Sequence, residues 1–252
     1  QLNIGLEHVV FIDDHPAERA RVREALPDVI VPEWPSDPTM FADVISDMGI
    51  FHALEVSDED RTRTKLYSSE SQRQGSQSNV MSMGEWLATL DLNIVCQSLD
   101  ESNISRATQL LNKTNQMNLR NRRMSKDELA QWNMQDENEC WVFRSIDRFG
   151  DSGLIGLLSL TFSQNAGYIS DYLLSCRVLG RGIEQTLLHV AALRARKKGC
   201  IKLNAECVPS DRNMPCRELM QQLLVIEDSS VPSYSLDPIA GFDLPVHVTL
   251  QL

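Results

Sequence analysis

The chain has 252 residues, enough for one large domain or two of ordinary size, and 42% of them are apolar, so a core can form. It carries 24 Lys and Arg against 35 Asp and Glu, a formal net charge of -11. Nucleic acids and anionic membranes both require a basic surface, so this charge argues against either as the main partner.

No apolar run approaches the length of a membrane-spanning helix, and residues 1–20 lack the basic-then-apolar pattern of a secretion signal. The chain begins with Gln1 rather than Met, so we expect that it was processed or cut from a longer protein. Its six cysteines never fall in a C-x-x-C spacing. Structural zinc is therefore not expected, and reduced thiols in a cytoplasm are the simplest interpretation.

The N-terminal residues follow a strand–helix–strand pattern. The apolar run Val9–Ile12 ends in Asp13 and Asp14, which predicts a central parallel strand buried on both faces. A helix is expected to start at Pro16, and residues 29–31 predict the next short strand. This order is typical of an α/β domain.

A change in composition divides the chain. Residues from about 38 to 78 have helical spacing and become increasingly polar, and the stretch Ser68–Asn79 contains no apolar residue. Such a stretch is typical of a linker. We therefore expect a first domain over 1–67, a linker over 68–80 and a second domain over 81–252.

The second domain is predicted to mix helices and strands. Helices are expected at 83–90, 104–111, 182–198 and 216–224. Strands are expected at 92–96, 141–143, 154–162, 168–174 and 201–207, with a glycine-rich turn over 147–153. The predicted fold class is therefore mixed, β-rich α/β.

Asp13 and Asp14 are the first candidate site. Carboxylates at the carboxyl end of a parallel strand lie where open α/β sheets bind ligands, and two adjacent acids suit Mg²⁺. The alternative is that one of them caps the helix at Pro16 and the other is solvated, which the residues alone make equally plausible.

The second candidate site is the turn between the strand at 168–174 and the following helix. Its glycines let the backbone approach a ligand, and N–H groups at a helix start favour an anion. A strand, an R-x-x-G-x-G turn and a helix resemble the arrangement with which GNAT-type acyltransferases grip the pyrophosphate of coenzyme A. The alternative is a helix that needs only a tight entry. The residues of this candidate are Arg177, Val178, Leu179, Gly180, Arg181 and Gly182.

Residues 9–19, followed by 31–35, closely resemble the FkbH-like branch of the haloacid dehalogenase superfamily. In that family the strand-end acid pair is the last of four motifs and helps to hold Mg²⁺, and Asp13 and Asp14 match it. The family usually has Asn where this chain has His15. The resemblance implies a partial Rossmann-like haloacid-dehalogenase-type sheet. The family's nucleophile would lie upstream, so the catalytic residues are unknown here and this half-site alone should be inert.

The resemblance continues to about residue 213 in the family's order. The matching runs are Gln109–Leu110 with Lys113–Leu119 (KTNQMNL), Asp147–Gly156 (DRFGDSGLIG) and Leu173–Gly182 (LLSCRVLGRG). It implies a protein that loads a glyceryl unit from 1,3-bisphosphoglycerate, a small phosphorylated acyl donor, onto an acyl carrier protein for polyketide biosynthesis. Because the carrier's phosphopantetheine is chemically the end of coenzyme A, we expect the GNAT-like second domain to receive it.

Three amides, Asn115, Gln116 and Asn118, form a third candidate, for substrate binding. They can fix a ligand by paired hydrogen bonds or can knit a loop to its neighbours. With the family resemblance the two roles are equally plausible.

The leading hypothesis is therefore a transferase fragment that recognises a carrier's phosphopantetheine or coenzyme A rather than performing the chemistry. The rivals are a non-catalytic carrier-protein docking module, an acyl-CoA N-acyltransferase and a phosphatase relic. The N-acyltransferase is weakened because no general base is recognisable near the predicted strand ends.

Overall fold

The computed structural model describes residues 6–50, 58–77, 82–227, 232–238 and 240–252. The chain divides into two compact units, unit 1 from Gln1 to Tyr67 and unit 2 from Ser68 to Leu252. The division falls where the composition changes. No helix in the described ranges is long and apolar enough to cross a membrane.

Unit 1 is mainly helical where it is described. Its elements are η1 (Leu6–His8), α1 (Pro16–Ala25), η2 (Pro38–Met40), α2 (Phe41–Asp47) and the first part of α3 (Asp58–Gln77). The two predicted strands are reduced to one parallel bridge between Val10 and Ile30. The Phe11 N–H donates to the Ile30 carbonyl at 2.9 Å, and the Ile30 N–H donates to the Val9 carbonyl at 3.0 Å.

The prediction of a strand buried on both faces is wrong for the described part of unit 1. Ile12 is 38% exposed and Ile30 is 41% exposed, because a single bridge provides no neighbouring strands or helix layers to cover both sides. The parallel direction agrees with a strand–helix–strand unit. The partial Rossmann-like sheet of the haloacid dehalogenase type remains a proposal.

The stretch expected as a linker over 68–80 is instead helical as far as it is described, since α3 continues to Gln77. Polar contacts attach this part of α3 to the rest of unit 2. The Ser69 hydroxyl donates to the Phe149 carbonyl at 3.0 Å, and the Trp86 indole N–H donates to the Ser76 hydroxyl at 3.0 Å. An apolar pattern is thus not the only way in which a helix attaches to its domain.

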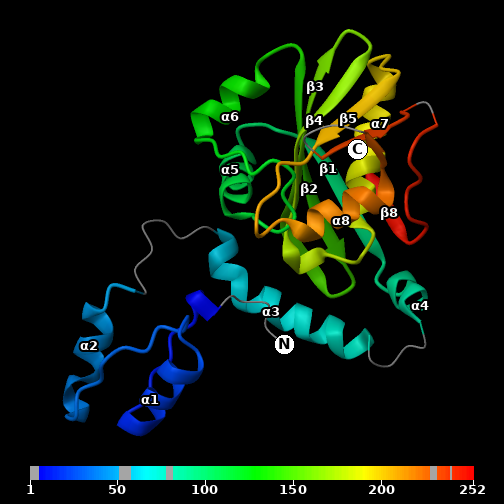
Figure 1. Ribbon diagram of the computed structural model, residues 1–252. Coiled ribbons are helices and arrows are strands. Elements are labelled where there is room, and N and C mark those ends of the chain that lie inside the picture. Colours follow the sequence, from blue (N-terminus) through cyan, green and yellow to red (C-terminus); the bar gives the residue numbers. More distant parts are fainter. Residues whose placement is uncertain (1–5, 51–57, 78–81, 228–231, 239) are drawn as a thin grey trace. The chain divides into compact units, whose positions relative to one another are not determined.

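The described part of unit 2 is built on one mixed eight-stranded sheet in the order β6-β7-β5-β4-β3-β2-β1-β8 (Figure 1). The pairs β4–β5 and β1–β8 are parallel and the others antiparallel. The strands are β1 (Leu92–Ser98), β2 (Asn138–Asp147), β3 (Gly150–Ser163), β4 (Ala166–Leu174), β5 (Lys202–Glu206), β6 (Val225–Glu227), β7 (Ser233–Leu236) and β8 (Val248–Gln251). The predicted mixed α/β class is confirmed.

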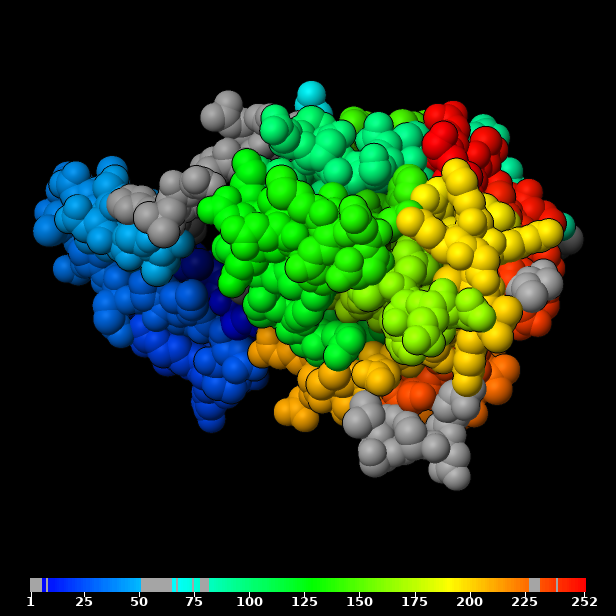
Figure 2. All heavy atoms as spheres, turned by 90° about the horizontal axis from the view of Figure 1, so that it is seen from above, coloured from blue at the N-terminus to red at the C-terminus, as the bar shows by residue number. Residues whose placement is uncertain are grey.

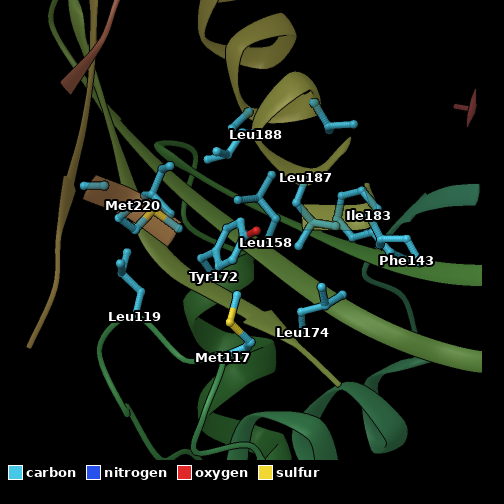
Figure 3. Packing of buried hydrophobic residues seen from close by; sticks show 14 of the residues in the cluster. Met117, Leu119, Phe143, Leu158, Tyr172, Leu174, Ile183, Leu187, Leu188 and Met220 are labelled. Atoms are coloured by element: carbon cyan, nitrogen blue, oxygen red, sulfur yellow. The ribbon is translucent and has the colours of Figure 1, made fainter. Parts of the chain in front are cut away.

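Helices cover both faces of this sheet (Figure 1). They are α4 (Met83–Ala88), α5 (Ile104–Lys113), α6 (Lys126–Asn133), α7 (Ile183–Lys197) and α8 (Met214–Leu223). Helices α5 and α6 enclose a smaller core with β2 and β3, and α7 and α8 enclose the larger one on the other face. Figure 3 shows Ile183, Leu187 and Leu188 of α7 directed towards Leu158 and Tyr172 of the sheet.

The β2–β3 hairpin is tighter than the sequence predicts. β2 runs to Asp147 and β3 begins at Gly150, so most of the expected turn over 147–153 lies in strands. Gly150 and Gly153 have positive φ angles of 133° and 70°. Glycine tolerates such angles within a strand. In the sequence, the same closely spaced glycines indicate a longer turn, which explains the difference.

A cluster of charged and aromatic side chains joins the C-terminal end of α7 to the sheet. Glu139 of β2 accepts hydrogen bonds from Arg194 Nε at 2.8 Å and from the Trp141 indole at 3.2 Å, and pairs with Lys198 at 3.1 Å. The Lys198 ammonium also lies 5.3 Å from the centre of the Phe162 ring. Figure 2 shows this yellow end of α7 beside the yellow-green tip of the β3–β4 hairpin.

This cluster predicts a pH-dependent stability. Burial raises the pKa of Glu139, but hydrogen bonds from Arg194 and Lys198 outweigh it, so the pKa lies below its ordinary value of 4.5. A lowered folded-state pKa stabilises the protein above the unfolded pKa and ceases to do so as the pH falls through the folded one. Glu139→Gln is therefore expected to cost about 1 kcal/mol at neutral pH, a cost that declines as the pH falls below 4.5 and vanishes once the pH is well below the lowered folded-state pKa. Thermal unfolding across this pH range checks it, with the exposed Glu137→Gln as control; a difference independent of pH would contradict it.

Candidate functional site

The turn from β4 to α7 has the local structure that the sequence predicts. β4 ends at Leu174, a short 3-10 helix follows (η3, Cys176–Val178), and α7 starts after Gly182. Gly180 and Gly182 have φ angles of +75° and +80°. A Cβ atom at Gly182 would lie 2.9 Å from His247 Nε2, so both the backbone angle and the space require glycine.

The charged groups of this turn are already engaged within the chain. Arg181 is 4% exposed, and its Nη2 donates to Glu70 Oε2 at 2.6 Å and to the Arg177 carbonyl at 2.8 Å. The Gly180 N–H donates to the carboxylate of Glu184 at 2.5 Å, and His247 Nε2 lies 2.8 Å from the Arg181 carbonyl oxygen. Two carboxylates therefore face the turn where the sequence alone suggests only positive charge.

Some donors of the turn are not satisfied by the helix itself. The N–H groups of the first turn of α7, those of Ile183, Glu184 and Gln185, have no acceptor within the helix because of helix geometry. Arg181 Nη1 is buried and has no hydrogen-bond partner in the described part of the chain. Arg177 is half-buried, and its Nε donates to Ser175 Oγ at 3.3 Å. The arrangement can hold one anionic group, in competition with Glu184.

The three candidate amides do not act together. Asn118 is completely buried: its Nδ2 donates to the Thr114 carbonyl at 2.9 Å, and its Oδ1 accepts the Asn121 N–H at 2.8 Å. Asn115 Oδ1 accepts a hydrogen bond from Arg123, and Gln116 is exposed. For Asn118 the structure shows the loop-knitting role, because its side-chain bonds are all made to its own loop. Of the three, Gln116 alone is exposed to a ligand.

Asp13 and Asp14 lie at the start of α1 in unit 1, but neither caps the helix. The N-cap is His15, whose Nδ1 accepts the Ala17 N–H at 3.3 Å. Asp13 Oδ1 accepts the His15 N–H at 2.8 Å, and Arg19 Nη1 donates to the carbonyls of Asp13 and Asp14 at 2.8 and 3.0 Å. The capping alternative for an aspartate is therefore wrong.

The acid pair by itself is an incomplete Mg²⁺ site. One oxygen of Asp13 is already engaged with a backbone N–H, and Asp14 is exposed. No group of three His, Cys, Asp or Glu side chains that could hold a metal occurs among the described residues. Since Mg²⁺ takes six oxygen ligands in strict geometry, two neighbouring carboxylates leave most of the shell to other groups.

Three residues that shape the turn were not among the predicted site residues: Glu70, Glu184 and His247. Glu184 was recognisable in principle, because an acid in the first turn of a helix lies close to the N–H groups that an anion would use. Glu70 and His247 lie 111 and 66 residues from Arg181, and nothing in their local sequence indicates the contact.

No protein-family model matches the chain, and no curated protein matches it. Among solved structures it is similar to the ribosomal-protein-S18-alanine N-acetyltransferase from Escherichia coli, with 11% identity and a TM-score of 0.45 over 57% of this chain and 93% of that one. The PaiA N-acetyltransferase from Thermoplasma acidophilum, solved in complex with coenzyme A, has 16% identity and a TM-score of 0.45 over 57% and 98%. A chimera of the Vibrio cholerae spermidine N-acetyltransferase SpeG and hSSAT has 15% identity and a TM-score of 0.46 over 58% and 96%. At these values the similarities assign no function to this chain.

Proposed function

We propose that this chain is the C-terminal part of an FkbH-like protein, which loads a glyceryl unit from 1,3-bisphosphoglycerate onto an acyl carrier protein for polyketide-type biosynthesis. In this proposal unit 2 is GNAT-like and contributes recognition: it binds the phosphate end of the carrier's phosphopantetheine, or of coenzyme A, at the turn Arg177–Gly182. The transfer chemistry is not performed in unit 2.

The observation that carries the proposal is the construction of this turn. Two glycines with positive φ lead directly into the first turn of a fifteen-residue helix. The first N–H groups of a helix have no acceptor inside it and point out of its N-terminal end. Such a terminus stabilises a phosphate through its N–H groups and the helix dipole. Arg177 adds a cation at the same turn.

The first test is the affinity of the chain for coenzyme A and for 4′-phosphopantetheine, measured by calorimetric titration. Arg177→Gln is expected to weaken binding about three- to tenfold because it removes a cation from the phosphate site. Glu184→Gln is expected to strengthen binding about three- to tenfold, because it removes a negative charge while its amide oxygen can still accept the Gly180 N–H. The two variants are thus expected to change the affinity in opposite directions. A turn that only connects β4 to α7 would not show this difference.

The matched control is Arg196→Gln, which makes the same change of charge at the exposed, opposite end of α7. It is expected to leave the affinity within about a factor of two, since it lies beyond a Debye length at physiological salt. If neither ligand binds the wild-type chain, or if Arg177→Gln and Arg196→Gln weaken binding equally, the turn is not the phosphate site.

A further inference from the structure

β4 and β5 separate part-way along their length. They pair in parallel only from Ala166–Lys202 to Ile169–Ala205, whereas β4 continues to Leu174. The second half of β4 therefore has an edge that β5 does not cover, and this edge leads directly into the turn Arg177–Gly182. We call the space beside it the β4 slot.

If the phosphate of an extended ligand lies on the turn, the amides of that ligand can lie along this edge of β4. Phosphopantetheine contains two amides, and a peptide-like chain adds to an open strand edge through main-chain hydrogen bonds. The groups that would receive it are the Tyr172 carbonyl and the Leu174 N–H.

Both groups are already bonded to the chain itself. The Leu174 N–H donates to the Met117 carbonyl at 3.0 Å, and the Leu119 N–H donates to the Tyr172 carbonyl at 3.1 Å. This is the pattern of an antiparallel bridge between Asn118 and Leu173.

The same segment also closes the slot on its other side. The Val208 N–H, just after β5, donates to the Leu119 carbonyl at 2.9 Å, and Asn213 Nδ2 donates to the Asn118 carbonyl at 3.0 Å. Met117 and Leu119 are 2% and 0% exposed and belong to the larger core. Figure 3 shows both of them beside Tyr172. The segment Met117–Leu119 thus occupies the slot through a single antiparallel bridge to β4.

Ion pairing holds this segment in place. Arg122 donates from Nε to Asp171 Oδ1 at 3.1 Å and pairs with the second carboxylate oxygen as well. Asp171 is completely buried on β4, and it also accepts the Ser159 hydroxyl. The Arg122 guanidinium lies 4.9 Å from the centre of the Trp132 ring. A segment with this many buried partners belongs to the stable part of a fold rather than to a mobile lid.

We infer that Met117–Leu119 closes the β4 slot as an integral part of the fold, so that unit 2 accepts the phosphate end of a phosphopantetheine but leaves no place along β4 for its acyl end. This specificity rests on the proposed function; the closure of the slot does not. An acyl-CoA N-acyltransferase that reads its cofactor along β4 is incompatible with the arrangement.

Amide hydrogen exchange of the full chain, resolved by NMR, tests the closure. The N–H groups of Leu119, Leu174 and Val208 are expected to exchange as slowly as those in the middle of β3, because each is held by a backbone hydrogen bond between β4, the segment Met117–Leu119 and the residues after β5. Fast exchange at these three amides, with β3 protected, would overturn the inference whether or not coenzyme A binds.

Exchange in saturating coenzyme A tests the specificity. Unchanged protection at the three amides, together with chemical-shift changes at the turn, is expected. A loss of protection at Leu119 with magnetisation transfer from the pantetheine methyl groups to Leu173 would show that the arm displaces the segment. If coenzyme A does not bind at all, the proposed function is refuted. The closure of the slot is then still tested by hydrogen exchange of the chain without coenzyme A.

Two neighbouring variants test whether the ion pair of Arg122 with Asp171 holds the segment Met117–Leu119 in place. Arg122→Gln leaves Asp171 buried without its cation and is expected to accelerate exchange at the three amides by about tenfold or more relative to β3. Arg120→Gln changes the same charge at an exposed side chain, whose pairing distance to Glu206 is 3.8 Å, and is expected to alter exchange by less than about twofold. Equal effects of the two variants would show that Arg122 does not hold the segment.

Discussion

Replacing Arg73 with methionine is expected to lower the free energy of unfolding by about 3–5 kcal/mol. Arg73 donates to both oxygens of Asp147, at 2.6 and 2.9 Å, and the two side chains are 3% and 1% exposed. The variant leaves the Asp147 carboxylate buried, with the Phe149 N–H as its remaining hydrogen-bond partner among the described residues. The cost is the desolvation of an unpaired charge, which is larger than the worth of the pair itself. Urea denaturation of the full chain measures it.

The exposed pair between Arg144 and Asp151 is the matched control. It joins β2 to β3 close to Asp147, but its side chains are 49% and 37% exposed. Arg144→Met is therefore expected to cost less than about 1 kcal/mol. The double variant Arg73→Met with Asp147→Leu is expected to recover a large part of the loss, because it removes both charges. A loss below about 1 kcal/mol for Arg73→Met would show that α3 does not depend on this contact.

Leu119→Ala is expected to destabilise the protein by about 2–5 kcal/mol, the cost of a cavity in a well-packed core. A residue between two helices and next to a run of arginines would ordinarily be a loop residue with a cost within about 0.5 kcal/mol. The larger value is expected because Leu119 is completely buried between Tyr172 and the residues around Met220 (Figure 3).

Gln116→Ala serves as the control for this prediction. Gln116 is exposed in the same segment, and its loss is expected to leave stability within about 0.5 kcal/mol. It also tests ligand binding separately, because Gln116 is the exposed member of the amide candidates. Urea denaturation compares both variants with the wild type; equal costs for Leu119→Ala and Gln116→Ala would contradict the placement of the segment in the core.

Unit 2 shows which parts of the fold are readable from local sequence. Helix α7 was predicted at 182–198 and lies at Ile183–Lys197, since its apolar residues repeat with the helical period and Gly199 follows it. β4 was predicted at 168–174 and lies at Ala166–Leu174. Short-range regularities of this kind depend on a few neighbouring residues, and the core of unit 2 agrees with them.

Other elements had no such signal. Helix α6 is held by a capping box between Ser125 and Glu128 rather than by a strong apolar pattern, and it was not predicted. The short strands β6, β7 and β8 were also missed. In unit 1 the apolar run before Asp13 indicated a buried strand, but burial depends on neighbouring layers that a run of residues cannot specify.

The sequence by itself determined the turn from Arg177 to Gly182, because positive φ angles demand glycine at two positions and the apolar period places a helix after them. Only the tertiary structure decided what surrounds this turn. Glu70 reaches Arg181 across 111 residues, and Met117–Leu119 takes the edge of β4 that a ligand would otherwise use. Both contacts join segments far apart in the chain, and their energies come from burial and pairing in three dimensions. Whether the donors of the turn remain available to a ligand is therefore a property of the folded unit.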